Sequence, residues 1–162
     1  MLTDYTTYDD VRSALGVSSD ELEDVTLALE SWDNHLRFEL EDISLALPAS
    51  YAAVVLIPQA SRTDEQERLY RATRLFSTLA VARAMTASLP LFGPKDISDG
   101  KATVSRFADA PYKAVTSRIE KQFEQAKGRL ESAWAAISAT AATAVARPYL
   151  GVSRPSTDPV TG

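Results

Sequence analysis

The stretch that decides the fold is residues 109–146, "DAPYKAVTSRIEKQFEQAKGRLESAWAAISATAATAVA". Apolar side chains recur along it every three or four positions, the spacing of one face of an α-helix. They are Val115, Ile119, Phe123, Ala126, Leu130, Ala133 and Ile137. Such a helix would be about 55 Å long, whereas a compact chain of 162 residues has a radius of gyration of only about 15 Å. We therefore expect this helix to extend past the body of the protein and to need a partner.

The segment after this helix, residues 147–162, reads "RPYLGVSRPSTDPVTG". Its prolines and glycines exclude a helix or a central strand, so we predict an extended tail. A disordered terminus is the ordinary interpretation of such a tail. Tyr149, Leu150 and Val152 favour a binding segment instead, because a fully solvated tail has little use for apolar side chains. The chain thus divides into a helical domain, residues 1–146, and a tail, residues 147–162.

Two stretches before the long helix also have helical periodicity. Residues 63–89 repeat apolar side chains on one face, with Thr63 as the N-terminal cap. Residues 18–47 carry a sustained apolar stripe and an outward face rich in acids, and Pro48 is expected to end that helix. Each stretch predicts one long helix.

The remaining segments are shorter. A short helix is expected to begin at Thr7, with Asp10 in a capping position, and to stop at Gly16. Residues 51–57, "YAAVVLI", fit either a buried strand or another helix, because periodicity cannot separate the two. The sequence as a whole predicts an all-α fold, a small helical bundle with a long C-terminal helix and an extended C-terminal tail.

Composition and motifs give no sign of catalysis. There are no cysteines and only one histidine, His35, which excludes thiolate zinc sites and two-histidine metal sites. The turn "DISDGKATVSRF", residues 96–107, fails as a phosphate-binding loop, because Lys95 and Ala102 stand where a glycine and a Ser or Thr are needed. The longest apolar run, residues 51–57, is far shorter than the ~20 residues of a membrane span. We expect no enzyme, no cofactor, no metal and no membrane association.

Charge is divided unevenly along the chain. Residues 1–47 contain 12 acids and 2 bases, a net charge of −10, and residues 48–162 contain 10 acids and 15 bases, a net charge of +5. This split suits copies that pack head to tail, with Arg68, Arg71 and Arg74 at the interface. Solvation alone also accounts for it. The same arginines leave open a nucleic-acid-binding regulator, although the chain is acidic overall, with a net charge of −5.

Three features follow one another in a familiar order: "DVRSALGV" at residues 10–17, a helical middle, and "ISDGKATVSRF" at residues 97–107 leading into a long charged helix. This order resembles the head–tail connector proteins (adaptor or head-completion proteins) of tailed bacteriophages, over most of the chain up to about Leu130. The resemblance implies a virion protein of the phage neck, assembled in the host cytoplasm. About a dozen copies would form a ring below the portal, extend the DNA channel and receive a neck or tail-completion protein.

The resemblance also implies roles for particular residues. The tail would bind the portal protein through Arg147, Tyr149, Leu150, Val152 and Arg154, and Lys101 would face a neighbouring subunit. DNA that must slide through a channel should meet few basic side chains, because each contact with a phosphate adds affinity. An acidic channel wall is therefore expected, formed by Glu21, Glu23, Asp24, Glu39 and Asp42. A helical scaffolding or interaction protein that acts without a portal remains the alternative.

Overall fold

The computed structural model describes residues 2–86, 96–98, 103–105 and 110–145. Its helices are α1 (Tyr8–Leu15), α2 (Asp24–Leu27), α3 (Glu30–Ile43), α4 (Leu47–Val55), α5 (Asp64–Thr86) and α7 (Ala110–Val145), with short 3-10 helices η1 (Leu2–Asp4) and η2 (Gln59–Ser61). The prediction of an all-α bundle with a long C-terminal helix is confirmed. The tail, residues 147–162, lies outside the described residues.

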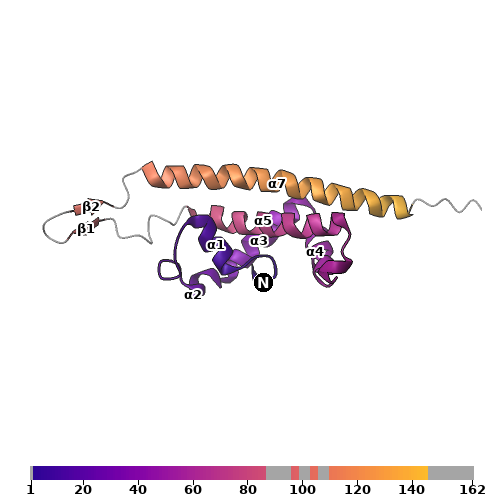
Figure 1. The fold of residues 1–162 in the computed structure, drawn as a ribbon, viewed down its shortest axis with the longest axis horizontal. Coiled ribbons are helices and arrows are strands. Elements are labelled where there is room, and N and C mark those ends of the chain that lie inside the picture. Colours follow the sequence, from indigo (N-terminus) through magenta and orange to yellow (C-terminus); the bar gives the residue numbers. More distant parts are fainter. Residues whose placement is uncertain (1, 87–95, 99–102, 106–109, 146–162) are drawn as a thin grey trace, which may run out of the picture.

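The fold is organised around α5. This helix packs against α1, α3, α4 and α7, so it is the common partner of the bundle. The longest helix, α7, has 36 residues and is therefore about 54 Å long. It lies along α5 and extends beyond it at its C-terminal end (Figure 1). The expectation of a final helix longer than the body agrees with this arrangement.

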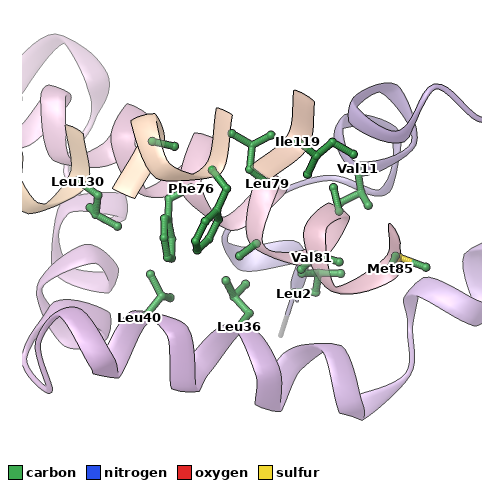
Figure 2. Close-up of a cluster of buried hydrophobic side chains, with 14 of the residues drawn as sticks. Leu2, Val11, Leu36, Leu40, Phe76, Leu79, Val81, Met85, Ile119 and Leu130 are labelled. Atoms are coloured by element: carbon green, nitrogen blue, oxygen red, sulfur yellow. The ribbon is translucent and has the colours of Figure 1, made fainter. Parts of the chain in front are cut away.

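The hydrophobic core lies between α3, α5 and α7. Figure 2 shows Leu36 and Leu40 of α3 pointing toward Phe76 of α5, with Ile119 and Leu130 of α7 reaching the same cluster from the other side. The apolar stripe expected on the final helix is the face that α7 buries: Ile119, Phe123, Ala126, Leu130 and Ala133 are buried. Burial of this face fixes which sides of α7 remain available for contacts.

Local signals set several helix ends as expected. The hydroxyl of Thr7 accepts a hydrogen bond from the Asp10 N–H at 3.1 Å, and Gly16 ends α1 with a φ of 75°. That left-handed conformation is cheap for glycine and strained for other residues. At the start of α5, Thr63 and Gln66 form a reciprocal capping box, with side chain to backbone distances of 3.3 and 3.0 Å.

The prediction of one helix over residues 18–47 is wrong. The segment folds as a turn, the four-residue α2, and α3, which ends at Ile43. Arg12 of α1 explains the break: its Nε–H donates to the Leu22 carbonyl at 2.8 Å, and its guanidinium also pairs with Asp24. These contacts hold residues before α3 against α1 instead of in a continuous helix.

The region around Pro48 also differs from the expectation. Pro48 does not end a helix but lies in the first turn of α4, where its missing N–H is harmless. The ambiguous residues 51–57 are helical as far as Val55, and α4 buries Leu47, Tyr51 and Val54. The sequence did not predict the strands β1 (Asp96–Ser98) and β2 (Thr103–Ser105), which pair antiparallel with Ile97 opposite Val104. The turn between them, with Lys101, lies outside the described residues.

A stack of three tyrosine rings ties the N-terminus to the bundle. Tyr51 stacks on Tyr5 and on Tyr70, with centroid distances of 5.1 and 5.9 Å. The Tyr51 hydroxyl donates to the Asp4 carbonyl at 3.2 Å. Burial raises the pKa of Tyr51 to about 12, since the phenolate is poorly solvated there. The stack joins the N-terminal residues to α4 and α5, and ionisation of Tyr51 would weaken it.

Candidate interaction surfaces

A groove runs between α5 and α7 on the surface of the bundle. It has a volume of about 660 Å³. Its walls are largely apolar and small, contributed by Ala72 and Leu75 of α5 and by Gly128, Ala133 and Ala136 of α7. A Cβ atom added at Gly128 would meet nothing within 4 Å, so the space beside α7 is open. The space remains open because most of the α7 wall is built from glycine, alanine and serine.

The rim of this groove is basic. Arg68, Arg71 and Arg129 line it, together with a single acid, Glu65. Arg71 donates from Nε to Glu67 at 2.7 Å, a hydrogen bond that holds the pKa of Glu67 below its ordinary value. Hydrogen bonds at the start of α5 and the charge of Arg68 hold the pKa of Glu65 below its ordinary value. The guanidinium groups of Arg68 and Arg129 beside apolar walls suit an anionic partner with an apolar side chain.

The groove continues toward α1. A second hollow of about 460 Å³ shares Leu75, Gln125 and Arg129 with the first and ends against Asp10 and Ala14 of α1. Arg118 of α7 closes this end by donating to the Ala14 carbonyl at 3.1 Å. The two hollows together form an extended track rather than an enclosed pocket.

A surface with exposed apolar side chains and an acid lies on and just after α3. Leu36 and Leu40 are buried, whereas Phe38 is 67% exposed and Leu45, just beyond the helix, is 83% exposed. Leu45 follows the end of α3, because Ser44 is already extended, with φ of −167° and ψ of 133°. Asp42 lies between Phe38 and Leu45 in the sequence and is exposed. We call Phe38, Asp42 and Leu45 the α3 outer face.

Periodicity alone missed this face. The spacing of residues 18–47 predicts acids on their outward side but no apolar contact residue there. The available signal was Phe38 itself, a large aromatic residue at a position that does not belong to the buried stripe. Contiguous exposed apolar patches with polar rims mark interaction sites, whereas single exposed apolar residues are common.

The predicted interface arginines separate in the structure. Arg68 and Arg71 line the groove. Arg74 turns toward α1, where it pairs with Asp10 at 3.4 Å and donates to the Tyr70 hydroxyl at 3.1 Å. The hydrogen bond to Tyr70 raises the pKa of Arg74. Arg74 and Arg71 are thus both engaged within the subunit, Arg71 through its hydrogen bond to Glu67. Arg68 and Arg71 nevertheless lie on the rim of the groove.

The predicted channel-lining acids do not gather in one cluster. Asp24 pairs with Arg12 of α1, and the Glu21 carboxylate accepts from the Ser18 N–H at 2.9 Å. Glu39 is mostly covered and lies 3.9 Å from the guanidinium of Arg83. Glu23 and Asp42 are exposed on separate elements. An acidic channel wall stays a prediction, and of the five residues these last two are the most accessible.

No catalytic arrangement surrounds His35. Its Nε2 lies 3.8 Å from Glu39, one helical turn away on α3, and the pair sits at the surface of the helix. In the described ranges no three His, Asp or Glu side chains gather where they could hold a metal ion. Nor is any helix within those ranges long and apolar enough to cross a membrane.

The predicted portal-binding residues, Arg147, Tyr149, Leu150, Val152 and Arg154, lie outside the described residues, as does Lys101. Comparison of the chain with protein-family models, curated protein sequences and solved structures returned no match. The likeness to phage connector proteins thus rests on the order of the sequence motifs.

Proposed function

We propose that the protein is a structural subunit of a phage neck, a head–tail connector whose copies form a ring below the portal. The ring would extend the DNA channel and join the capsid to the tail. The observation that carries this proposal is α7, a 36-residue helix that outreaches the body it packs on and leads directly into the apolar, proline-rich tail. A helix of this kind can carry a binding segment away from the subunit toward a larger partner.

The surfaces of the subunit support an assembling part over an isolated one. A basic, apolar groove and an acidic, apolar outer face occur on the same chain. Ring subunits need two such different surfaces, because a heterologous contact uses one of each on every copy. In this proposal the protein is not an enzyme, needs no cofactor and lets DNA pass without specific binding.

Binding to the portal is assigned to residues 147–162. Leu150 and Val152 alternate along an extended segment and so face the same side. Ordering a tail costs about 1–2 kcal/mol per backbone residue, so several anchors must act together and are reinforced by repetition around a ring. Portal acids are the natural partners of Arg147 and Arg154.

The test is co-sedimentation of the full chain with a purified portal protein from the same phage genome. The variant Leu150→Asp with Val152→Asp should lose portal binding while its circular dichroism stays that of the full chain. The matched control, Ser153→Asp with Ser156→Asp, adds the same charge to the same tail but keeps the anchors, and should still bind. Normal binding by the first variant would move the attachment to the helical body.

A nucleic-acid-binding regulator makes a different prediction. It would bind duplex DNA as a monomer, with an affinity that falls steeply as salt rises. The connector proposal expects no such binding by the isolated subunit at physiological salt. Salt-dependent DNA binding that disappears in Arg68→Glu with Arg129→Glu would favour the regulator instead.

A further inference from the structure

We propose that the α3 outer face of one copy docks in the α5–α7 groove of the next copy. Phe38 enters the groove, Leu45 covers its apolar edge, and Asp42 meets the guanidinium groups of Arg68 and Arg129 on the rim. This inference deepens the proposed function, since it names the surfaces through which ring subunits bind one another. Its test, however, needs no portal.

The first argument is apolar complementarity. Phe38 projects from the side of α3 opposite to Leu36 and Leu40, which Figure 2 shows pointing into the core. An aromatic side chain buries about 150–250 Å² when it is enclosed, and Phe38 is two-thirds exposed in the single subunit. The groove of about 660 Å³ has room for it and for a neighbouring side chain.

The second argument is charge. Asp42 lies one helical turn from Phe38 on α3 and is exposed. Arg68 and Arg129 stand beside the apolar walls of the groove, where the rim also carries Arg71 and one acid, Glu65, on which the charge of Arg68 acts. Docking therefore brings an acid to two bases at the same time as it buries the aromatic ring. The net charges of the two segments are complementary in the same way: residues 1–47, which include α3, carry −10, and residues 48–162, which include α5 and α7, carry +5.

The third argument is placement. Helix α5 packs against both α3 and α7. Phe38 points away from the core-facing Leu36 and Leu40 of α3, which Figure 2 shows, whereas the groove lies between α5 and α7. Neither surface can meet the other within one copy. When two copies join this way, one keeps a free groove and the other keeps a free α3 outer face. A third copy can therefore bind at either end. The occupant that the groove fits is thus a second copy of this chain.

Two variants separate the surfaces without disturbing the core. Phe38→Glu removes the apolar contact from an exposed position and leaves the groove intact. Gly128→Phe places a ring in the groove from α7 itself, at a site where an added Cβ meets no atom within 4 Å. Matched controls are Asn34→Glu, on the same exposed side of α3, and Ser117→Phe, which is exposed on α7 and does not line either hollow.

The measurement is analytical ultracentrifugation of each full-length protein and of the two variants mixed in equal amounts. The unmodified chain and both controls should self-associate, and each variant alone should associate at least about tenfold more weakly, a loss of about 1.4 kcal/mol. The mixture should form a heterodimer and stop there, because the Gly128→Phe copy supplies the α3 outer face and the Phe38→Glu copy supplies the groove.

Three results would overturn the inference: a wild-type chain that stays monomeric at about 100 µM, variants that associate like their controls, or a mixture that forms no heterodimer. The outcome is separable from that of the proposed function. If Phe38→Glu still forms rings on a portal, the docking assignment fails and the connector function stands. If self-association follows the variants but no portal is bound, the docking assignment stands and the connector function fails.

Discussion

Replacement of Phe123 by alanine tests whether α7 belongs to the core of a single subunit. Phe123 is buried. The centroid of its ring lies 5.2 Å from that of Phe76 of α5, and the two ring planes are inclined at 34°. The guanidinium carbon of Arg83 lies 4.4 Å above the same ring. The substitution therefore removes apolar burial, an aromatic pair and a cation–π contact at one point of the α5–α7 interface.

The expected cost follows from these contacts. Truncating a buried Phe to Ala lowers the free energy of unfolding by about 3–5 kcal/mol. Within that total, the aromatic pair contributes about 0.5–1.5 kcal/mol and the partly exposed cation about 0.5–1 kcal/mol. We predict a loss of about 4 kcal/mol. For a chain of this size each kcal/mol shifts Tm by about 2–4 °C, so Tm should fall by about 8–16 °C.

Urea unfolding followed by circular dichroism measures this loss. The control is Gln122→Ala, the exposed neighbour on α7, which should change the free energy of unfolding by less than about 0.5 kcal/mol. A double-mutant cycle with Phe76→Leu and Phe123→Leu should give a coupling energy near that of an aromatic pair, about 0.5–1.5 kcal/mol. If Phe123→Ala is no more destabilising than the control, α7 does not pack on α5 in the isolated subunit and the reasoning is refuted.

Three further predictions concern single positions. Gly16→Ala should destabilise the protein by about 1–2 kcal/mol, because alanine is strained at the φ of 75° of this position. Gly128→Ala should stabilise it by up to about 1 kcal/mol, because the added methyl group meets no atom and alanine favours the helix. Equal effects of the two substitutions in urea unfolding would contradict both predictions. The raised pKa of Tyr51 means that its phenolate favours the unfolded chain, so stability should be lost as pH rises from about 10 to about 12. Tyr51→Phe should reduce this alkaline loss of Tm. A pH profile of Tm that is unchanged in the variant would argue against burial of this hydroxyl. Asp24→Asn should lower Tm at neutral pH by weakening the ion pair with Arg12, and a Tm equal to that of the unmodified chain would leave Asp24 free for a channel wall.

The parts of the fold that could be predicted are those with local causes. Thr7 and Gly16 bound α1 through contacts with residues a few positions away, and the Thr63–Gln66 capping box starts α5 in the same way. The α7 stripe is buried as its spacing indicates, because a single long face packs against a single long helix. In each case the residues near in sequence carry the information.

The parts that could not be predicted depend on distant contacts. The apolar spacing of residues 18–47 suits a helix, but Arg12 captures the Leu22 carbonyl and Asp24 from α1. The indole N–H of Trp32 donates to the Thr26 carbonyl at 2.8 Å, which turns the chain between α2 and α3. Periodicity counts where apolar side chains fall and does not register a buried arginine from another helix. Pro48 was misleading for a related reason, since a proline suits the first turn of a helix as well as the end of the one before it.

The candidate surfaces, too, could be predicted from the sequence only in part. The arginines of α5 were visible in the sequence, but the groove also needs Gly128, Ala133 and Ala136, which become its wall only when α7 lies along α5. Phe38 was visible as well, yet its exposure follows from the burial of Leu36 and Leu40 on the other side of α3. An interaction surface depends on which faces the fold has already covered.

The most direct test of the connector account is electron microscopy of the full chain co-expressed with the portal protein of the same phage genome. The account predicts portal particles with an added coaxial ring, formed by about twelve copies in head-to-tail contact. Portal particles with no added density, beside protein that remains separate at both low and high salt, would contradict it.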